Sequence, residues 1–157
     1  MSHPVDIFAA GVRDGAYPGG QLAASREGVR LVSAAAGRLG PDLEPTTRAA
    51  IYDLASLTKP LAAALLAGRA LERGRCQLSD PLSNFVPGGD PEVTLAHVLE
   101  HAAGYPAHVR FDRRLPPRLV PGSWEAWRHV VLDAARHPRE APPGRRALYS
   151  DLGFILL

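Results

Sequence analysis

The stretch YDLASLTKP at positions 52–60 runs directly into the apolar segment LAAALLA at positions 61–67. Alanine and leucine occupy every side of this segment, which predicts a helix that is buried all round. A proline is tolerated only within the first turn of a helix, so Pro60 places Ser56 at or just before the helix start. Ser56 and Lys59 are then one turn apart and lie on the same face.

A serine three positions before a lysine is a pattern that can support nucleophilic catalysis. The hydroxyl needs a neighbouring base, and a lysine amine is a base only where its surroundings lower its pKa. The positive end of a buried helix disfavours a protonated amine and favours an oxyanion on a substrate carbonyl. Lys59 is the only lysine in the chain, and arginine keeps its proton at ordinary pH. Two interpretations remain: Ser56 and Lys59 form a catalytic pair, or their spacing is a coincidence.

Positions 52–61 resemble the first active-site motif of the serine β-lactamase and penicillin-binding protein superfamily. The similarity is greatest to the branch with class C β-lactamases, D-alanyl-D-alanine carboxypeptidases and β-lactamase-fold esterases. In that family the serine of an S-x-x-K motif is acylated, and the lysine helps to activate it. The resemblance therefore implies that Ser56 is the nucleophile and that Lys59 assists it.

A second stretch, PPGRRALYSDLGF at positions 142–154, resembles the Y-x-N motif of the same family in its place and setting. The resemblance implies that Tyr149 transfers protons and that Asp151, in the place of the asparagine, holds the lysine and the substrate. An ionised aspartate accepts hydrogen bonds but cannot donate them, and its charge raises the pKa of a nearby lysine. Asp151 therefore shifts the predicted role of base from Lys59 toward Tyr149 assisted by a lysine cation.

The order of the elements expected in the N-terminal third agrees with this family. Apolar residues at helical spacing over Pro4–Val12 predict a short amphipathic helix. The extended runs Gly19–Ser25 and Val29–Gly37 predict a β-hairpin with Gly28 at its turn. The family likewise opens with a helix and then an antiparallel pair of strands.

Two histidines occupy the next expected helix, for which Thr94 is the predicted N-cap. His97 and His101 are four positions apart, a spacing that suits a metal on a helix face. No third ligand is spaced to join them, and the resemblance supplies no metal. We therefore favour a structural role in which His101 holds the loop that follows, and we predict no metal site and no organic cofactor.

The third quarter of the chain is predicted to be a loop followed by a helix. Four arginines and three prolines without a sustained period make Val109–Pro121 a surface loop, whose arginines are either solvated or in contact with an anionic substrate. Ser123 is the predicted N-cap of a helix that carries Trp124 and Trp127. Core packing is the default expectation for these two rings.

The composition is that of one ordinary soluble domain, with 157 residues, 46% hydrophobic and 22% charged. A net charge of +2 from scattered residues argues against a nucleic-acid partner. Cys76 is alone and has no internal disulfide partner. Residues Met1–Asp6 lack the basic start and apolar run of a signal peptide, and no segment is long enough to cross a bilayer. These features predict a cytoplasmic chain with no membrane partner.

The sequence and the resemblance together predict an α+β fold of the β-lactamase/transpeptidase type, with a helical region beside an incomplete antiparallel sheet. The third family motif, K-T-G or a histidine variant on a C-terminal strand, is absent. Residues 1–157 are thus expected to be the N-terminal part of a domain whose site needs the missing part. The implied function is acyl-enzyme hydrolysis of a small ester or amide, such as a β-lactam, a D-alanyl peptide or a carboxylic ester. The alternative is a non-catalytic remnant or binding module of the same fold.

Overall fold

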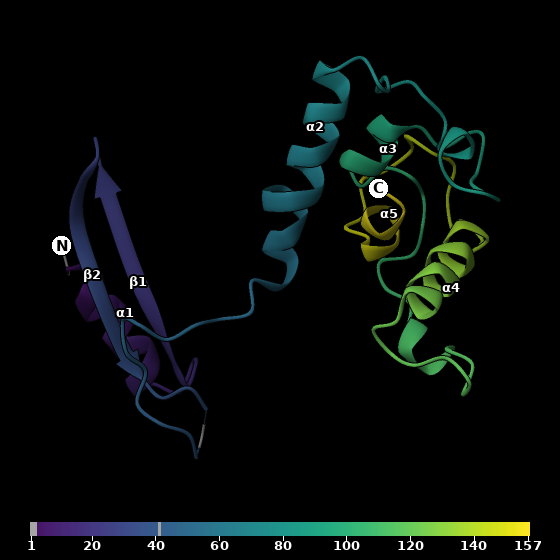
Figure 1. The fold of residues 1–157 in the computed structure, drawn as a ribbon. Coiled ribbons are helices and arrows are strands. Elements are labelled where there is room, and N and C mark those ends of the chain that lie inside the picture. The colour runs from purple at the N-terminus through teal and green to yellow at the C-terminus, as the bar shows by residue number, and fades with distance from the viewer. Residues whose placement is uncertain (1–2, 41) are drawn as a thin grey trace. The chain divides into compact units, whose positions relative to one another are not determined.

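The computed structural model describes residues 3–40 and 42–157, which divide into two compact units, Met1–Asp53 and Leu54–Leu157 (Figure 1). Met1, Ser2 and Pro41 lie outside the described residues, and with them the start of the stretch considered above for a signal peptide. The expectation of one partial domain over residues 1–157 stays a prediction.

The first unit consists of one helix and one hairpin. Helix α1 (Pro4–Arg13) is followed by strands β1 (Gly19–Arg26) and β2 (Val29–Gly37), which pair in an antiparallel ladder. The turn residues Glu27 and Gly28 both have positive φ, 51° and 79°. This conformation matches the right-handed twist of the strands, which is why glycine is favoured there. The predicted helix and hairpin are confirmed.

Packing within the first unit depends on two aromatic rings. The rings of Phe8 in α1 and Tyr17 before β1 stack with their centroids 5.9 Å apart. The Tyr17 hydroxyl also donates a hydrogen bond to the Phe8 carbonyl oxygen over 2.6 Å. The helix is therefore held to the start of the hairpin by both apolar and polar contacts.

The second unit begins with a continuous helical run. A 3-10 turn, Ala55–Leu57, leads into a wider π-type segment, Lys59–Ala64, and then into α2 (Leu65–Glu72). Three further α-helices follow among the described residues, namely α3 (Leu95–Leu99), α4 (Trp124–Ala135) and α5 (Asp151–Leu156). Pro60 lies in the first turn of its segment, where its missing N–H costs no hydrogen bond. This agrees with the predicted start of the helix.

The core of the second unit lies between α3, α4, α5 and the connecting loops. Its largest fully buried side chains are Leu82, Val93, Val98, Tyr105 and Leu152. Because Leu152 is the second residue of α5, the core fixes the N-terminus of that helix.

The two predicted N-caps are confirmed. The Thr94 hydroxyl accepts a hydrogen bond from the backbone N–H of His97, and the Ser123 hydroxyl accepts one from the backbone N–H of Ala126. The His97 imidazole in turn accepts from the N–H of Thr94, which completes a reciprocal cap at the start of α3.

Two burial predictions are wrong. Leu61, Leu65 and Leu66 are each more than half exposed, because Leu54–Leu157 supplies packing partners for only part of this helix. Trp124 and Trp127 are also exposed and stack on one another, with centroids 4.5 Å apart. Helix α4 instead meets the core through Ala134 and Ala135, with Val130 and Val131 packed against it. Within the described ranges, no helix is both long enough and apolar enough to span a bilayer.

Candidate active site

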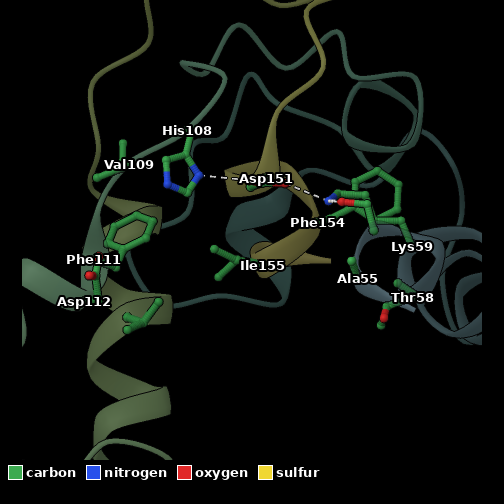
Figure 2. A pocket seen from close by; sticks show the side chains of 13 residues that line it. Ala55, Thr58, Lys59, His108, Val109, Phe111, Asp112, Asp151, Phe154 and Ile155 are labelled. Carbon is green, nitrogen blue, oxygen red and sulfur yellow. Dashed lines mark hydrogen bonds and ion pairs between the residues drawn. The ribbon is translucent and has the colours of Figure 1, made fainter. Parts of the chain in front are cut away.

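The four site residues named from the sequence come together within the second unit. Lys59 lies at their centre, with its Nζ 3.2 Å from Ser56 Oγ and 2.7 Å from Asp151 Oδ1 (Figure 2). Lys59 Nζ also lies 4.9 Å from the centroid of the Tyr149 ring, and the interaction of the Tyr149 hydroxyl with Ser56 and Lys59 lowers the pKa of the phenol. Lys59 and Asp151 are 92 positions apart in the chain. The fold therefore gathers a hydroxyl, a phenol and a carboxylate around one amine.

The charge state of Lys59 follows from two opposing effects. Burial by itself lowers the pKa of Lys59, but hydrogen bonds and charge from Asp151 and Tyr149 outweigh it and raise the pKa overall. The carboxylate accounts for more of this rise than the phenol, so the predicted direction of its effect is confirmed. Lys59 is therefore a cation at neutral pH.

The same contacts favour the ionised forms of the two acidic groups. Hydrogen bonds from Ser56 and Lys59 lower the pKa of Tyr149, and the positive charge of Lys59 adds to this effect. The pKa of Asp151 is lowered first by its hydrogen bond from Lys59 and then by its contact with His108. A proton can thus leave Tyr149 more easily than it leaves an ordinary tyrosine, while Asp151 stays ionised.

His101 holds the two residues on either side of Tyr149, Leu148 and Ser150. Its carbonyl oxygen accepts a hydrogen bond from the N–H of Leu148 over 2.8 Å, and its Nδ1 accepts one from the N–H of Ser150 over 3.1 Å. The imidazole also packs against Tyr149 and Phe154, with centroids at 4.5 and 4.9 Å. Burial first, and then the charge of Lys59, lowers the pKa of His101, so its ring is neutral and able to accept. His101 therefore has a structural role, but these contacts hold residues 148–150 and not, as predicted, the loop that follows His101.

The His97 and His101 pair has no further ligand beside it. Within residues 3–40 and 42–157, no three histidine, cysteine, aspartate or glutamate side chains gather closely enough to hold a metal ion. His97 serves instead in the cap of α3.

The backbone next to Ser56 is in an unusual conformation. Ala55 has φ of 44°, in the left-handed region that costs a non-glycine residue about 1–2 kcal/mol. Such strain persists only where the surrounding structure enforces it, and it is concentrated at functional sites. The strained backbone at Ala55 is therefore a second, independent indication that the turn carrying Ser56 is a functional site.

A cleft of about 470 Å³ opens beside the polar groups (Figure 2). Ser56, Lys59 and Asp151 line one part of it, and apolar side chains line most of the rest: Val109, Phe111, Val130, Phe154 and Ile155. A mainly apolar hollow with a few convergent polar groups is the usual form of a small-molecule site.

One polar residue of the cleft, His108, was not assigned a role from the sequence. Its Nδ1 lies 2.9 Å from Asp151 Oδ2, although the two residues are 43 positions apart. No periodicity or spacing connects them, so the contact depends on the tertiary fold alone.

The chain belongs to the beta-lactamase family, whose model, described as Beta-lactamase, matches residues 5–157. Over 119 residues it is 28% identical to a protein of Salmonella paratyphi B named "Putative D-alanyl-D-alanine carboxypeptidase"; the match covers 68% of this chain and 27% of that protein. The family predicted from the two motifs is therefore confirmed.

Solved structures agree with this assignment. SurE, solved with D-Leu, is 27% identical with a TM-score of 0.71, over 96% of this chain and 34% of SurE. A penicillin-binding protein from Bacillus halodurans is 25% identical with a TM-score of 0.71, over 99% of this chain and 47% of that protein. The predicted α+β fold of the β-lactamase and penicillin-binding protein type, with an incomplete sheet, is confirmed. The chain spans between about a quarter and a half of the length of these relatives.

Proposed function

We propose that the protein containing this chain is a serine hydrolase that acts through an acyl-enzyme on an ester or amide. The observation that carries the proposal is the convergence of Ser56, Lys59 and Tyr149 at the edge of an apolar cleft. Each group supplies one need of acyl transfer, namely a nucleophile, a fixed positive charge and a proton carrier.

In the proposed first step, Ser56 Oγ attacks the substrate carbonyl carbon and its proton passes to the Tyr149 oxygen. The Lys59 cation stabilises the ionised form of Tyr149 that accepts this proton, which agrees with the direction of both pKa shifts. The carbonyl electron pair moves onto oxygen, where the backbone N–H of Ser56 donates a hydrogen bond to it. The intermediate then collapses, and the leaving group takes the proton from Tyr149.

In the second step, water attacks the acyl carbon and gives a proton to Tyr149. Collapse of this intermediate breaks the bond to Ser56 Oγ, which recovers its proton. No metal or organic cofactor is needed for either half of the cycle.

The substrate class is proposed as a β-lactam, a D-alanyl peptide or a carboxylic ester. The relative named "Putative D-alanyl-D-alanine carboxypeptidase" and the SurE structure with D-Leu support the peptide member of this set. The apolar lining of the cleft fits the uncharged part of such an acyl group.

The second candidate is a non-catalytic remnant or binding module of the same fold. It is supported by the raised pKa of Lys59, which keeps the amine protonated and unable to act as the base for Ser56. Residues 1–157 do not contain the family's third motif. We therefore expect little or no turnover from these residues alone.

The experiment is covalent labelling of Ser56. The protein, both as residues 1–157 and with any continuation of its reading frame, is treated with a fluorophosphonate or a labelled penicillin, digested and analysed by mass spectrometry. We expect an adduct on the Ser56 peptide that is lost in Ser56→Ala and kept in Ser79→Ala, a matched change at an exposed serine. An adduct of equal yield in Ser56→Ala would refute Ser56 as nucleophile, and no adduct in any form would favour the non-catalytic module.

A further inference from the structure

Residues 106–108 precede the loop that carries Val109 and Phe111 to the cleft. Three successive contacts align them with residues 150–151 at the start of α5. The Ser150 hydroxyl donates to the carbonyl oxygen of Pro106 over 2.7 Å. The backbone N–H of Asp151 donates to the carbonyl oxygen of Ala107 over 2.9 Å. His108 then meets the Asp151 carboxylate over 2.9 Å. Residues 106–108 therefore follow residues 150–151 in a fixed register.

The two oxygens of the Asp151 carboxylate have different partners (Figure 2). Oδ1 accepts from Lys59 Nζ, and Oδ2 faces His108 Nδ1. Because an ionised carboxylate can only accept, the proton of this second contact belongs to His108 Nδ1. Rotation of the carboxylate would break both contacts at once, so each partner restrains the orientation that the other requires.

We propose that His108 is a positioning residue: it fixes the Asp151 carboxylate and, through it, holds the Lys59 amine beside Ser56. The inference rests on the proposed function for its effect on rate, and on the three contacts above for its geometry. His108 also begins the loop that brings Val109 and Phe111 to the cleft. It therefore connects this loop to Asp151 and Lys59.

A role in packing does not account for His108. Its side chain is 60% exposed, and an exposed ion pair adds about 0.2–1 kcal/mol to stability at most. The titratable groups that act on Asp151 are Lys59 and His108, and Asp151 in turn acts on Tyr149 and His101. His108 contacts the Asp151 oxygen that Lys59 leaves free.

The first test compares His108→Ala, His108→Asn and the control His129→Ala, a partly exposed histidine outside the cleft. The rate of Ser56 acylation by the fluorophosphonate is measured against pH. His108→Ala is expected to lower the rate by up to about fivefold, the equivalent of an exposed ion pair. It should also move the acidic limb to higher pH, because Asp151 loses one of the two hydrogen bonds that lower its pKa. The asparagine keeps an N–H donor and should restore the profile, and His129→Ala should leave it unchanged.

The second test does not need turnover. Since Lys59 is the only lysine, lysine labelled with ¹³C at Cε gives one NMR signal whose shift reports its titration. His108→Ala is expected to move this titration to lower pH than in the wild type, and His108→Asn is not.

The outcomes separate the two proposals. Suppose that the wild type is acylated and that His108→Ala has the same pH profile and the same Lys59 titration. The positioning role is then overturned, and the proposed function stands. If the wild type forms no adduct, the proposed function fails, and the Lys59 titration alone decides whether His108 positions the pair.

Discussion

Replacing Asp151 by asparagine removes one charge of the central ion pair and keeps the size of the side chain. Two unit charges 2.7 Å apart attract by about 1.5 kcal/mol in bulk water. The Lys59 and Asp151 side chains are 15% and 35% exposed, so the attraction is stronger here but is offset by the cost of desolvation. We expect Asp151→Asn to lower the free energy of unfolding by about 1–2 kcal/mol at pH 7, between the values for exposed and buried pairs.

The loss should depend on pH in a defined direction. The pKa of Asp151 is lowered by hydrogen bonds from Lys59 and His108, so its stabilisation is full above the ordinary aspartate value of about 4 and is lost as the pH falls through the lowered value. The pKa of Lys59 is raised above 10.5 although burial opposes the shift. Its stabilisation is therefore full below that pH and is lost as the pH rises through the raised value. The difference between the two proteins should be greatest between about pH 5 and 10.

The assay is urea unfolding followed by far-ultraviolet circular dichroism at pH 7 and at pH 3. Asp112→Asn is the matched control, because Asp112 pairs with Arg110 in a setting where both side chains are more than half exposed; it should leave the urea midpoint close to that of the wild type. Equal stability of wild type and Asp151→Asn at pH 7 would refute the reasoning. A loss that is as large at pH 3 as at pH 7 would show that charge is not its cause.

Three further substitutions test the geometry around the site. Tyr149→Phe should slow Ser56 acylation by about 100-fold or more while the melting temperature stays close to wild type, because the ring contact with His101 is kept; a rate within tenfold of wild type would contradict the proton-transfer role. His101→Ala should lower the free energy of unfolding by about 2 kcal/mol, since it leaves a backbone N–H without its acceptor; an unchanged urea midpoint would contradict this. Gly104→Ala would bring a Cβ to 2.1 Å from the Ala141 carbonyl oxygen, whereas Gly122→Ala meets open space at a similar φ of +83°; the first should cost at least about 2 kcal/mol more in urea unfolding than the second, and equal costs would exclude the clash.

The local features of this protein could be predicted from its sequence. Helical periodicity and the position of Pro60 place Ser56 and Lys59 one turn apart, and the structure has their side chains in contact. The cap at Thr94 and the turn at Gly28 were also predictable, because both depend on hydrogen bonds and dihedral angles of adjacent residues. The resemblance of two short motifs added Tyr149 and Asp151 to the same site.

Contacts between distant groups, and the burial of each surface, depend on the tertiary fold. The contact of His108 with Asp151 follows from the alignment of two loop segments, which no spacing in the chain encodes. Leu65 and Trp124 are exposed, although their hydrophobic side chains predicted burial. Burial depends on what the rest of the chain supplies as a packing partner, whereas periodicity describes only the segment itself. The local geometry of the nucleophile therefore follows from adjacent residues, whereas its charged surroundings follow from packing across the second unit.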